Sequence, residues 1–263
     1  MSKQMKQDKR SPLTDKPLRN PGQSLERQLD DLLLNKVMQP IIIAATLVWM
    51  AGMEWWYHFH PQARSPITAS IIASAVVVYA AFRIWRTWPE LKQLRQGIDG
   101  EKAVGQFLER LRESGYQVFH DVMGDDFNVD HVIIGPAGVF TIETKTISKP
   151  MRGETKIQFD GETIQVNGQA MERNPVRQAK AQSSWLKKIL QETTEREYKV
   201  RPVVVFPGWF IEQKPGSLRE MWVLEPKALP SFLENAPNVL SAEEIKNASG
   251  NLSRFIRAQE KNL

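Results

Sequence analysis

Two long apolar runs precede a region of short, alternating apolar segments. Residues 41–57 contain Glu54 as their only charge, and residues 66–82 contain no charge. As helices, at about 1.5 Å per residue, each would be about 26 Å long, close to the thickness of a hydrocarbon core. Five of the eight tryptophans lie in or beside these runs, as in an interfacial belt: Trp49, Trp55, Trp56, Trp85 and Trp88. The pattern predicts a transmembrane helical hairpin over 41–85; the alternative is a hairpin buried in a soluble core.

Basic residues around the hairpin predict its orientation. Residues 1–40 carry eight Lys or Arg, and four more follow the second run at 83, 86, 92 and 95, whereas the connector has only Arg64. By the positive-inside rule both termini are cytoplasmic, and we expect a two-pass protein of the cell inner membrane. The tail, 1–40, is expected to begin disordered and to hold an amphipathic helix over 24–38 that Pro40 ends. Residues 86–96 are expected to form a polar juxtamembrane helix or linker.

Beyond residue 96 the periodicity alternates between helix and strand. An amphipathic helix is expected from Gly97 to near Gly115, then strands at 116–122, 130–134 and 139–145 and a hairpin over 156–166. A helix begins at Asn174-Pro175, a buried strand covers 200–206, and a short strand covers 221–224. Helices are expected over 229–235 and after Ser241, with Gly250 as a possible break. This order predicts an α/β sandwich with a mixed sheet over 97–258, and residues 211–263 as an extension packing on the domain at 97–210.

Composition and net charge limit the kinds of metal site, cross-link and partner that the chain can have. The chain has no cysteine, so disulfides and thiolate zinc sites are excluded. A net charge of +5 permits binding to nucleic acid or to an anionic membrane and proves neither.

The hairpin of residues 130–145 carries the strongest chemical pattern. If Ile134 and Val139 close a turn over Gly135 to Gly138, Asp130 lies opposite Glu143. Lys145 points to the same face as Glu143, because strand side chains alternate. Two carboxylates and an ammonium that converge in this way are typical of a site for a metal ion and water. The chain has seven Glu-x-Lys tripeptides, so the tripeptide alone would indicate an exposed ion pair; only this one ends an apolar strand with an acid on its partner.

Two further side chains fall on predicted buried stripes. Glu101 lies three residues before Val104, on the apolar side of its helix, where it could equally be a first-turn acid facing the helix dipole. Gln178 lies seven residues before Trp185, also on the side expected to be buried, and could instead be a helix-end amide bonded to nearby backbone.

These blocks resemble a known family. Gly97-x-x-Gly-Glu101, Asp130-His131-Val-Ile-Ile-Gly-Pro-x-Gly138, Val139-Phe-x-Ile-Glu143-x-Lys145 and Asn174-Pro175-x-x-Gln178 are similar to the nuclease-related domain, a branch of the restriction-endonuclease-like PD-(D/E)xK superfamily. The resemblance spans about residues 97–210. Many superfamily members have a proline before the first core acid, whereas this chain has Val129 there.

The resemblance implies an α-β-β-β-α-β core and divalent-metal-dependent cleavage of nucleic acid, with DNA favoured. Asp130 and Glu143 match the metal ligands, Lys145 the water-activating lysine, Glu101 an auxiliary acid and Gln178 an orienting amide. Mg²⁺ or Mn²⁺ would sit between the two carboxylates, with the Thr144 carbonyl and waters. The alternatives are a catalytically inactive, membrane-tethered module that binds nucleic acid, and an envelope assembly protein that acts through protein contacts.

Overall fold

The structure is a computed structural model that describes residues 18–60, 66–124, 127–149, 156–171 and 174–261. The chain divides into two compact units. One comprises Gly22–Ala103, and the other comprises Met1–Pro21 with Val104–Leu263. Each is described by itself.

The Gly22–Ala103 unit is a helical hairpin. Helix α1 (Gln23–Leu32), a π-helical segment (Leu33–Met38) and α2 (Gln39–Phe59) follow one another without a break, and α3 (Ile67–Glu109) returns beside them. Three side-chain pairs join the antiparallel arms: Glu26 with Lys102, Lys36 with Glu90 at 2.9 Å, and Trp55 Nε1 with Ser70 Oγ at 2.9 Å. Small buried residues, Ala44, Ala51, Ala73 and Ala80, allow the helix backbones to approach closely.

Both arms are apolar on their outer surface. α1–α2 and α3 are each long and apolar enough to cross a membrane, and only 11% of the most apolar window of each is buried. Among the described residues, all the exposed large apolar side chains except Leu18, Phe210 and Val239 lie between Leu34 and Trp88. Within the described residues, the most apolar window of each arm is therefore mostly uncovered.

Two expected helix boundaries in this unit are wrong. Pro40 does not end a helix, because the π-helical segment before it widens the turn, with Gln39 N–H bonded to the Leu34 carbonyl, and so accommodates a residue that lacks an N–H. No helix starts at Gly97, because α3 runs through it and through Pro89. Residues 90–96, between Pro89 and Gly97, are strong helix formers and offset the free-energy cost of a proline and a glycine inside a helix.

The other unit is built on a five-stranded mixed sheet. Its strands are β1 (Gln117–Met123), β2 (Asn128–Gly135), β3 (Gly138–Thr144), β7 (Val200–Val205) and β9 (Trp222–Leu224), in the order β1-β2-β3-β7-β9. β1 and β3 are each antiparallel to β2, β7 runs parallel to β3, and β9 runs parallel to β7. All of β3 is buried, including its polar residues Thr141, Glu143 and Thr144.

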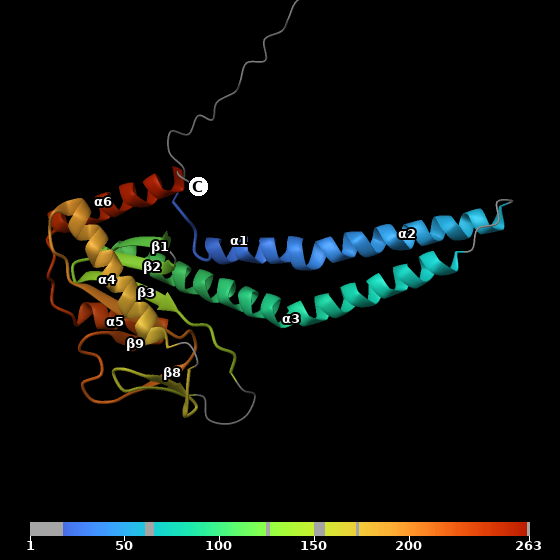
Figure 1. The fold of residues 1–263 in the computed structure, drawn as a ribbon. Coiled ribbons are helices and arrows are strands. Elements are labelled where there is room, and N and C mark those ends of the chain that lie inside the picture. The colour runs from blue at the N-terminus through green and yellow to red at the C-terminus, as the bar shows by residue number, and fades with distance from the viewer. Residues whose placement is uncertain (1–17, 61–65, 125–126, 150–155, 172–173, 262–263) are drawn as a thin grey trace, which may run out of the picture. The chain divides into compact units, whose positions relative to one another are not determined.

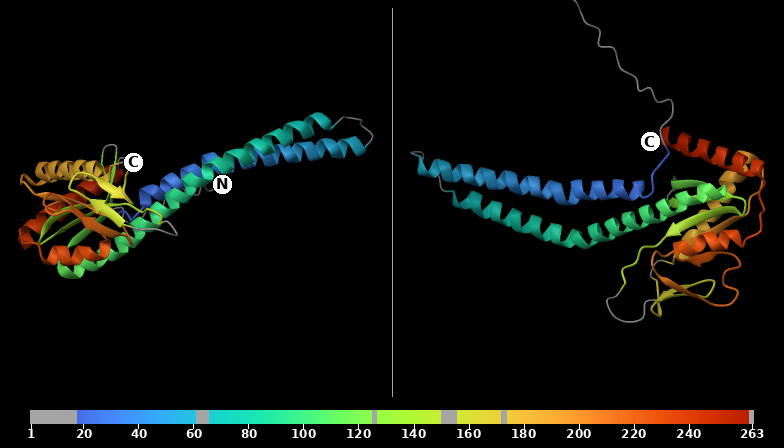
Figure 2. Two further views of the ribbon diagram at one scale, coloured as in Figure 1. Left: turned by 90° about the horizontal axis from the view of Figure 1, so that it is seen from below. Right: turned by 180° about the vertical axis from the view of Figure 1, so that it is seen from behind.

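Helices cover both faces of this sheet (Figures 1 and 2). On one face, Ile133 and Phe140 pack with the end of α3, from Val104, and with α5 (Leu229–Glu234). On the other face, Val132 and Ile134 pack with α4 (Pro175–Thr194) and α6 (Ala242–Lys261). The alternation along β2 therefore decides which helix each side chain meets.

A second, four-stranded mixed sheet contains the hairpin expected over 156–166. It contains β6 (Gln169–Ala170), β5 (Ile164–Val166), β4 (Lys156–Phe159) and β8 (Phe210–Gln213), in that order. β8 was not predicted, since four residues with a single apolar pair give little period-2 pattern. Gly250 does not break α6, which continues to Lys261.

A buried charge cluster holds the segment before Pro21 against the sheet. Arg19 Nη1 lies 2.7 Å from Asp121 Oδ2, and Arg19 Nε lies 2.8 Å from Glu260 Oε1. The side chains of Arg19 and Asp121 are 2% and 1% exposed. The Arg19 guanidinium therefore joins Asp121 of β1 to Glu260 of α6.

Candidate nuclease site

The β2–β3 hairpin has the predicted register. Ile134 pairs with Val139 and His131 with Ile142, so one further step along the strands brings Asp130 beside Glu143. The turn needs its glycines. Gly138 has φ 124°, and a Cβ on Gly135 would lie 2.2 Å from the Tyr116 ring.

Asp130 and Glu143 occupy different environments. Asp130 is half-buried, and its Oδ2 accepts a 2.6 Å hydrogen bond from the backbone N–H of Thr144. Glu143 is 2% exposed, and its two carboxylate oxygens accept from two different side chains. The hairpin therefore holds one accessible and one enclosed carboxylate on the face covered by α4.

Lys145 follows directly after β3 and contacts two residues. Its Nζ lies 2.5 Å from Glu143 Oε1 and 3.1 Å from Gln178 Oε1. The backbone N–H of Lys145 bonds to the Val205 carbonyl at 2.9 Å, which anchors it to β7. The convergence of an ammonium on this carboxylate matches the prediction.

The amide that holds Glu143 is Gln182, which the sequence analysis missed. Its Nε2 donates to Glu143 Oε2 at 2.6 Å and to the Asn128 carbonyl at 2.9 Å, and the residue is 1% exposed. The expectation that Gln178 is buried is wrong, because Gln178 lies on the exposed side of α4 and reaches the site only through Lys145. The sequence signal for Gln182 is that it lies three residues after Ala179 and four before Leu186, on the apolar stripe of α4.

The donor atoms suit a hard divalent cation. Among the described residues no group of three His, Cys, Asp or Glu could hold a metal, so any ion here would rely on two carboxylates and neutral oxygens. Within the described ranges of the chain, Gln182 Oε1 is a buried oxygen without a hydrogen-bond partner, on the amide that holds Glu143. Mg²⁺ takes one or two carboxylates and fills its other positions with neutral oxygens and water. The set fits.

Glu101 lies on α3 and belongs to the Gly22–Ala103 unit. It is 8% exposed, as expected for a residue on the buried stripe of its helix. Its role beside Asp130 and Glu143 stays a prediction.

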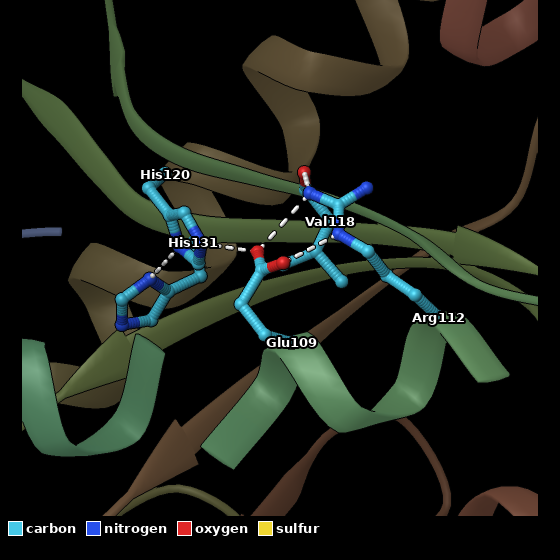
Figure 3. A network of polar contacts seen from close by, with 5 residues as sticks. All are labelled: Glu109, Arg112, Val118, His120 and His131. Atoms are coloured by element: carbon cyan, nitrogen blue, oxygen red, sulfur yellow. Dashed lines mark hydrogen bonds and ion pairs between the residues drawn. The ribbon is translucent and has the colours of Figure 1, made fainter. Parts of the chain in front are cut away.

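A polar network lies on the opposite face of the sheet (Figure 3). His120 and His131 are cross-strand partners, and their Nδ1 atoms are 2.9 Å apart, so one ring donates and the other accepts. His120 Nε2 contacts Glu109 Oε1 at 2.8 Å, and Arg112 Nε contacts Glu109 Oε2 at 2.6 Å. The Arg112 guanidinium and the bond to His120 lower the pKa of Glu109.

Burial lowers the pKa of His120, and it lowers the pKa of His131 further. Both rings are therefore neutral at neutral pH. His131 is adjacent to Asp130, yet its side chain points away from the carboxylate pair, because strand neighbours face opposite sides.

Comparison with known proteins finds a family match and a relative that cover parts of the chain. An uncharacterized protein of Bacillus anthracis is 36% identical over 66 residues, which cover 23% of this chain and 31% of that protein. The chain thus matches about a third of the length of that relative. No solved structure matches the chain. A nuclease-related domain is found at residues 96–207, the segment that contains Asp130, Glu143, Lys145 and both amides of α4.

Proposed function

We propose that residues 97–210 form a divalent-metal-dependent nuclease of the PD-(D/E)xK type, with a restriction-endonuclease-like α-β-β-β-α-β core, that hydrolyses phosphodiester bonds of DNA. The observation that carries the proposal is the convergence of Lys145 and Gln182 on the enclosed carboxylate of Glu143, beside Asp130. The nuclease-related domain over the same residues supports nucleic acid as the substrate.

The metal would be held by Asp130 and Glu143, with Gln182 Oε1 and the Thr144 carbonyl as neutral donors. When bound, Mg²⁺ or Mn²⁺ acidifies water and neutralises charge on the phosphoryl group.

The chain's own residues perform the remaining tasks. Thr144 N–H fixes the orientation of Asp130, and Gln182 fixes that of Glu143. Lys145 places a positive charge where negative charge grows during attack on the phosphate, and it can orient the attacking water through its remaining N–H donors. Gln178, exposed and bonded to Lys145, is placed to orient that water or the phosphate, and Glu101 is proposed as an auxiliary acid acting through water.

The test is calorimetric titration of Mn²⁺ into the full chain in detergent micelles, followed by a plasmid cleavage assay. The wild type should bind Mn²⁺ and cleave DNA. An Asp130→Asn/Glu143→Gln double variant should do neither. A Glu192→Gln/Glu234→Gln variant removes two exposed carboxylates elsewhere and should behave as the wild type. A folded wild type that neither binds Mn²⁺ nor cleaves DNA would refute the proposal.

A second candidate is an inactive module that binds nucleic acid with the same fold. It is favoured by the full engagement of Glu143, whose two oxygens already accept from Lys145 and Gln182. Tight, metal-independent DNA binding by the wild type without turnover would support this candidate.

We further propose that α2 and α3 anchor the domain in the cell inner membrane, with both termini and the nuclease domain in the cytoplasm. The exposed apolar surface of the hairpin supports a lipid environment. The chain lacks cysteine, so single cysteines can report its topology. In intact cells an impermeant maleimide should label Phe59→Cys, near the end of α2, and should label Lys246→Cys only after lysis. Labelling of Lys246→Cys in intact cells would exclude this orientation.

A further inference from the structure

A cavity of about 530 Å³ lies away from the candidate site, at the other end of β3. It is bounded by the β2–β3 turn, the beginnings of β3 and β7, and α5 with the segment that follows it. Its volume lies within the range of about 300 to 1,000 Å³ that is usual for pockets that bind small organic molecules. We refer to it as the α5 pocket.

Two cations, Arg201 and Lys199, line the α5 pocket. The Arg201 guanidinium lies 4.7 Å from the centre of the Trp222 ring, and Lys199 is exposed at the rim. Within the part of the chain that the structure describes, neither side chain has an ion pair with a carboxylate. Burial lowers the pKa of Arg201, which shows that its charge is partly removed from water. A partly desolvated guanidinium with unused N–H donors is suited to an anion, and above all to a phosphate.

The remaining wall is aromatic and aliphatic. Phe140 stacks on Trp222 with ring centroids 5.2 Å apart, and Phe232 meets Trp222 edge-on at 5.3 Å. Phe232 is half-buried and Val239 is 58% exposed, so both offer apolar surface to the cavity. Ser231 and Asn235 add polar groups. A ligand that fits this pocket therefore carries an anion on a flat, largely apolar group.

We propose that the α5 pocket binds a mononucleotide, with its phosphate on Arg201 and Lys199 and its base against Phe232 and Val239. The choice of a nucleotide rests on the proposed function, because hydrolysis of nucleic acid supplies this class of ligand.

The α5 pocket is distinct from the candidate site. Phe140 and Arg201 are parallel-strand partners near the beginnings of β3 and β7, whereas Glu143 pairs with Val204 near the ends. Three residues of strand separate them by about 10 Å. Phe140 and Trp222 also belong to the core on the α5 face, whereas Glu143 bonds to Gln182 of α4. The ligand is therefore a free nucleotide rather than the scissile residue of a bound strand.

The experiment is calorimetric titration of adenosine 5′-monophosphate into the full chain in detergent micelles. The wild type should bind one equivalent. Arg201→Met, which keeps the apolar stem over Trp222, should weaken binding about 10- to 100-fold through loss of charge-assisted hydrogen bonds. Lys199→Met should weaken binding in the same direction, and its exposed position leaves folding unaffected. Lys246→Met makes the same change of charge on the exposed side of α6 and should bind as the wild type does.

Two further probes separate the parts of the ligand. Adenosine and inorganic phosphate should each bind more weakly than the monophosphate; either one binding as tightly would overturn the proposal. So would a wild type that does not bind, or two variants with unchanged affinity. The Glu143→Gln variant should keep wild-type affinity for the nucleotide, so this site and the nuclease can fail independently.

Discussion

Replacing Gln182 by leucine should loosen the end of β3, whereas the same change one helical turn earlier should not. Gln182→Leu preserves the approximate size of the side chain and removes two hydrogen bonds to buried acceptors. Gln178→Leu removes one 3.1 Å bond at an exposed position. The two variants therefore share their chemistry and their helix and differ in burial.

The magnitude follows from the partners. The bond to the Glu143 carboxylate contributes about 1.5 to 3 kcal/mol, and the bond to the Asn128 carbonyl contributes about 1 kcal/mol. Removal of the unpartnered Gln182 Oε1 offsets about 1 kcal/mol of this. The net loss for Gln182→Leu is about 1.5 to 3 kcal/mol, whereas Gln178→Leu should cost less than about 0.5 kcal/mol.

Hydrogen–deuterium exchange with mass spectrometry, on the full chain in micelles, measures this locally. Amides of β3 should exchange about 10- to 140-fold faster in Gln182→Leu, since each 1.4 kcal/mol corresponds to about a tenfold change. In Gln178→Leu the change should stay within about threefold. Equal effects of the two changes, or a larger effect of Gln178→Leu, would show that Gln182 does not hold Glu143.

Three further predictions concern stability, each measured by urea unfolding of the full chain in micelles. Arg19→Met should lower the free energy of unfolding by about 3 to 5 kcal/mol, because it removes the guanidinium that bonds to two enclosed carboxylates. Lys187→Met, at an exposed ion pair, should cost less than about 1 kcal/mol, and equal losses in the two variants would contradict this prediction. Burial lowers the pKa of His120 from its ordinary value of 6.5, so folding favours the neutral ring. The free energy of unfolding should therefore be greatest above pH 6.5 and should fall as the pH drops below that value. A His120→Gln variant whose free energy of unfolding depends on pH in the same way as that of the wild type would contradict this. Gly135→Ala should cost about 1 to 3 kcal/mol, because its Cβ would meet the Tyr116 ring, and a variant as stable as the wild type would show that the ring moves aside freely.

The local pattern determined much of the sheet. Residues 130–145 predicted both strands, their turn and their register, because the side-chain period of a strand and the glycines of the turn leave one pairing that buries the apolar side chains on both strands. The same pattern placed Lys145 on the side of Glu143. Lys145 Nζ bonds to Glu143 Oε1, because both residues belong to one short segment.

Tertiary structure decided which distant groups meet that hairpin. The periodicity of α4 made Gln178 and Trp185 share a side, but it could not say how α4 is rotated against the sheet. Packing turned Gln182 inward and left Gln178 exposed. The parallel pairing of β8 with β4 joins residues more than fifty positions apart, and Arg19 meets Glu260 across almost the whole chain. Such contacts depend on the positions of whole elements, whereas sequence periodicity records only the orientation of side chains within one element.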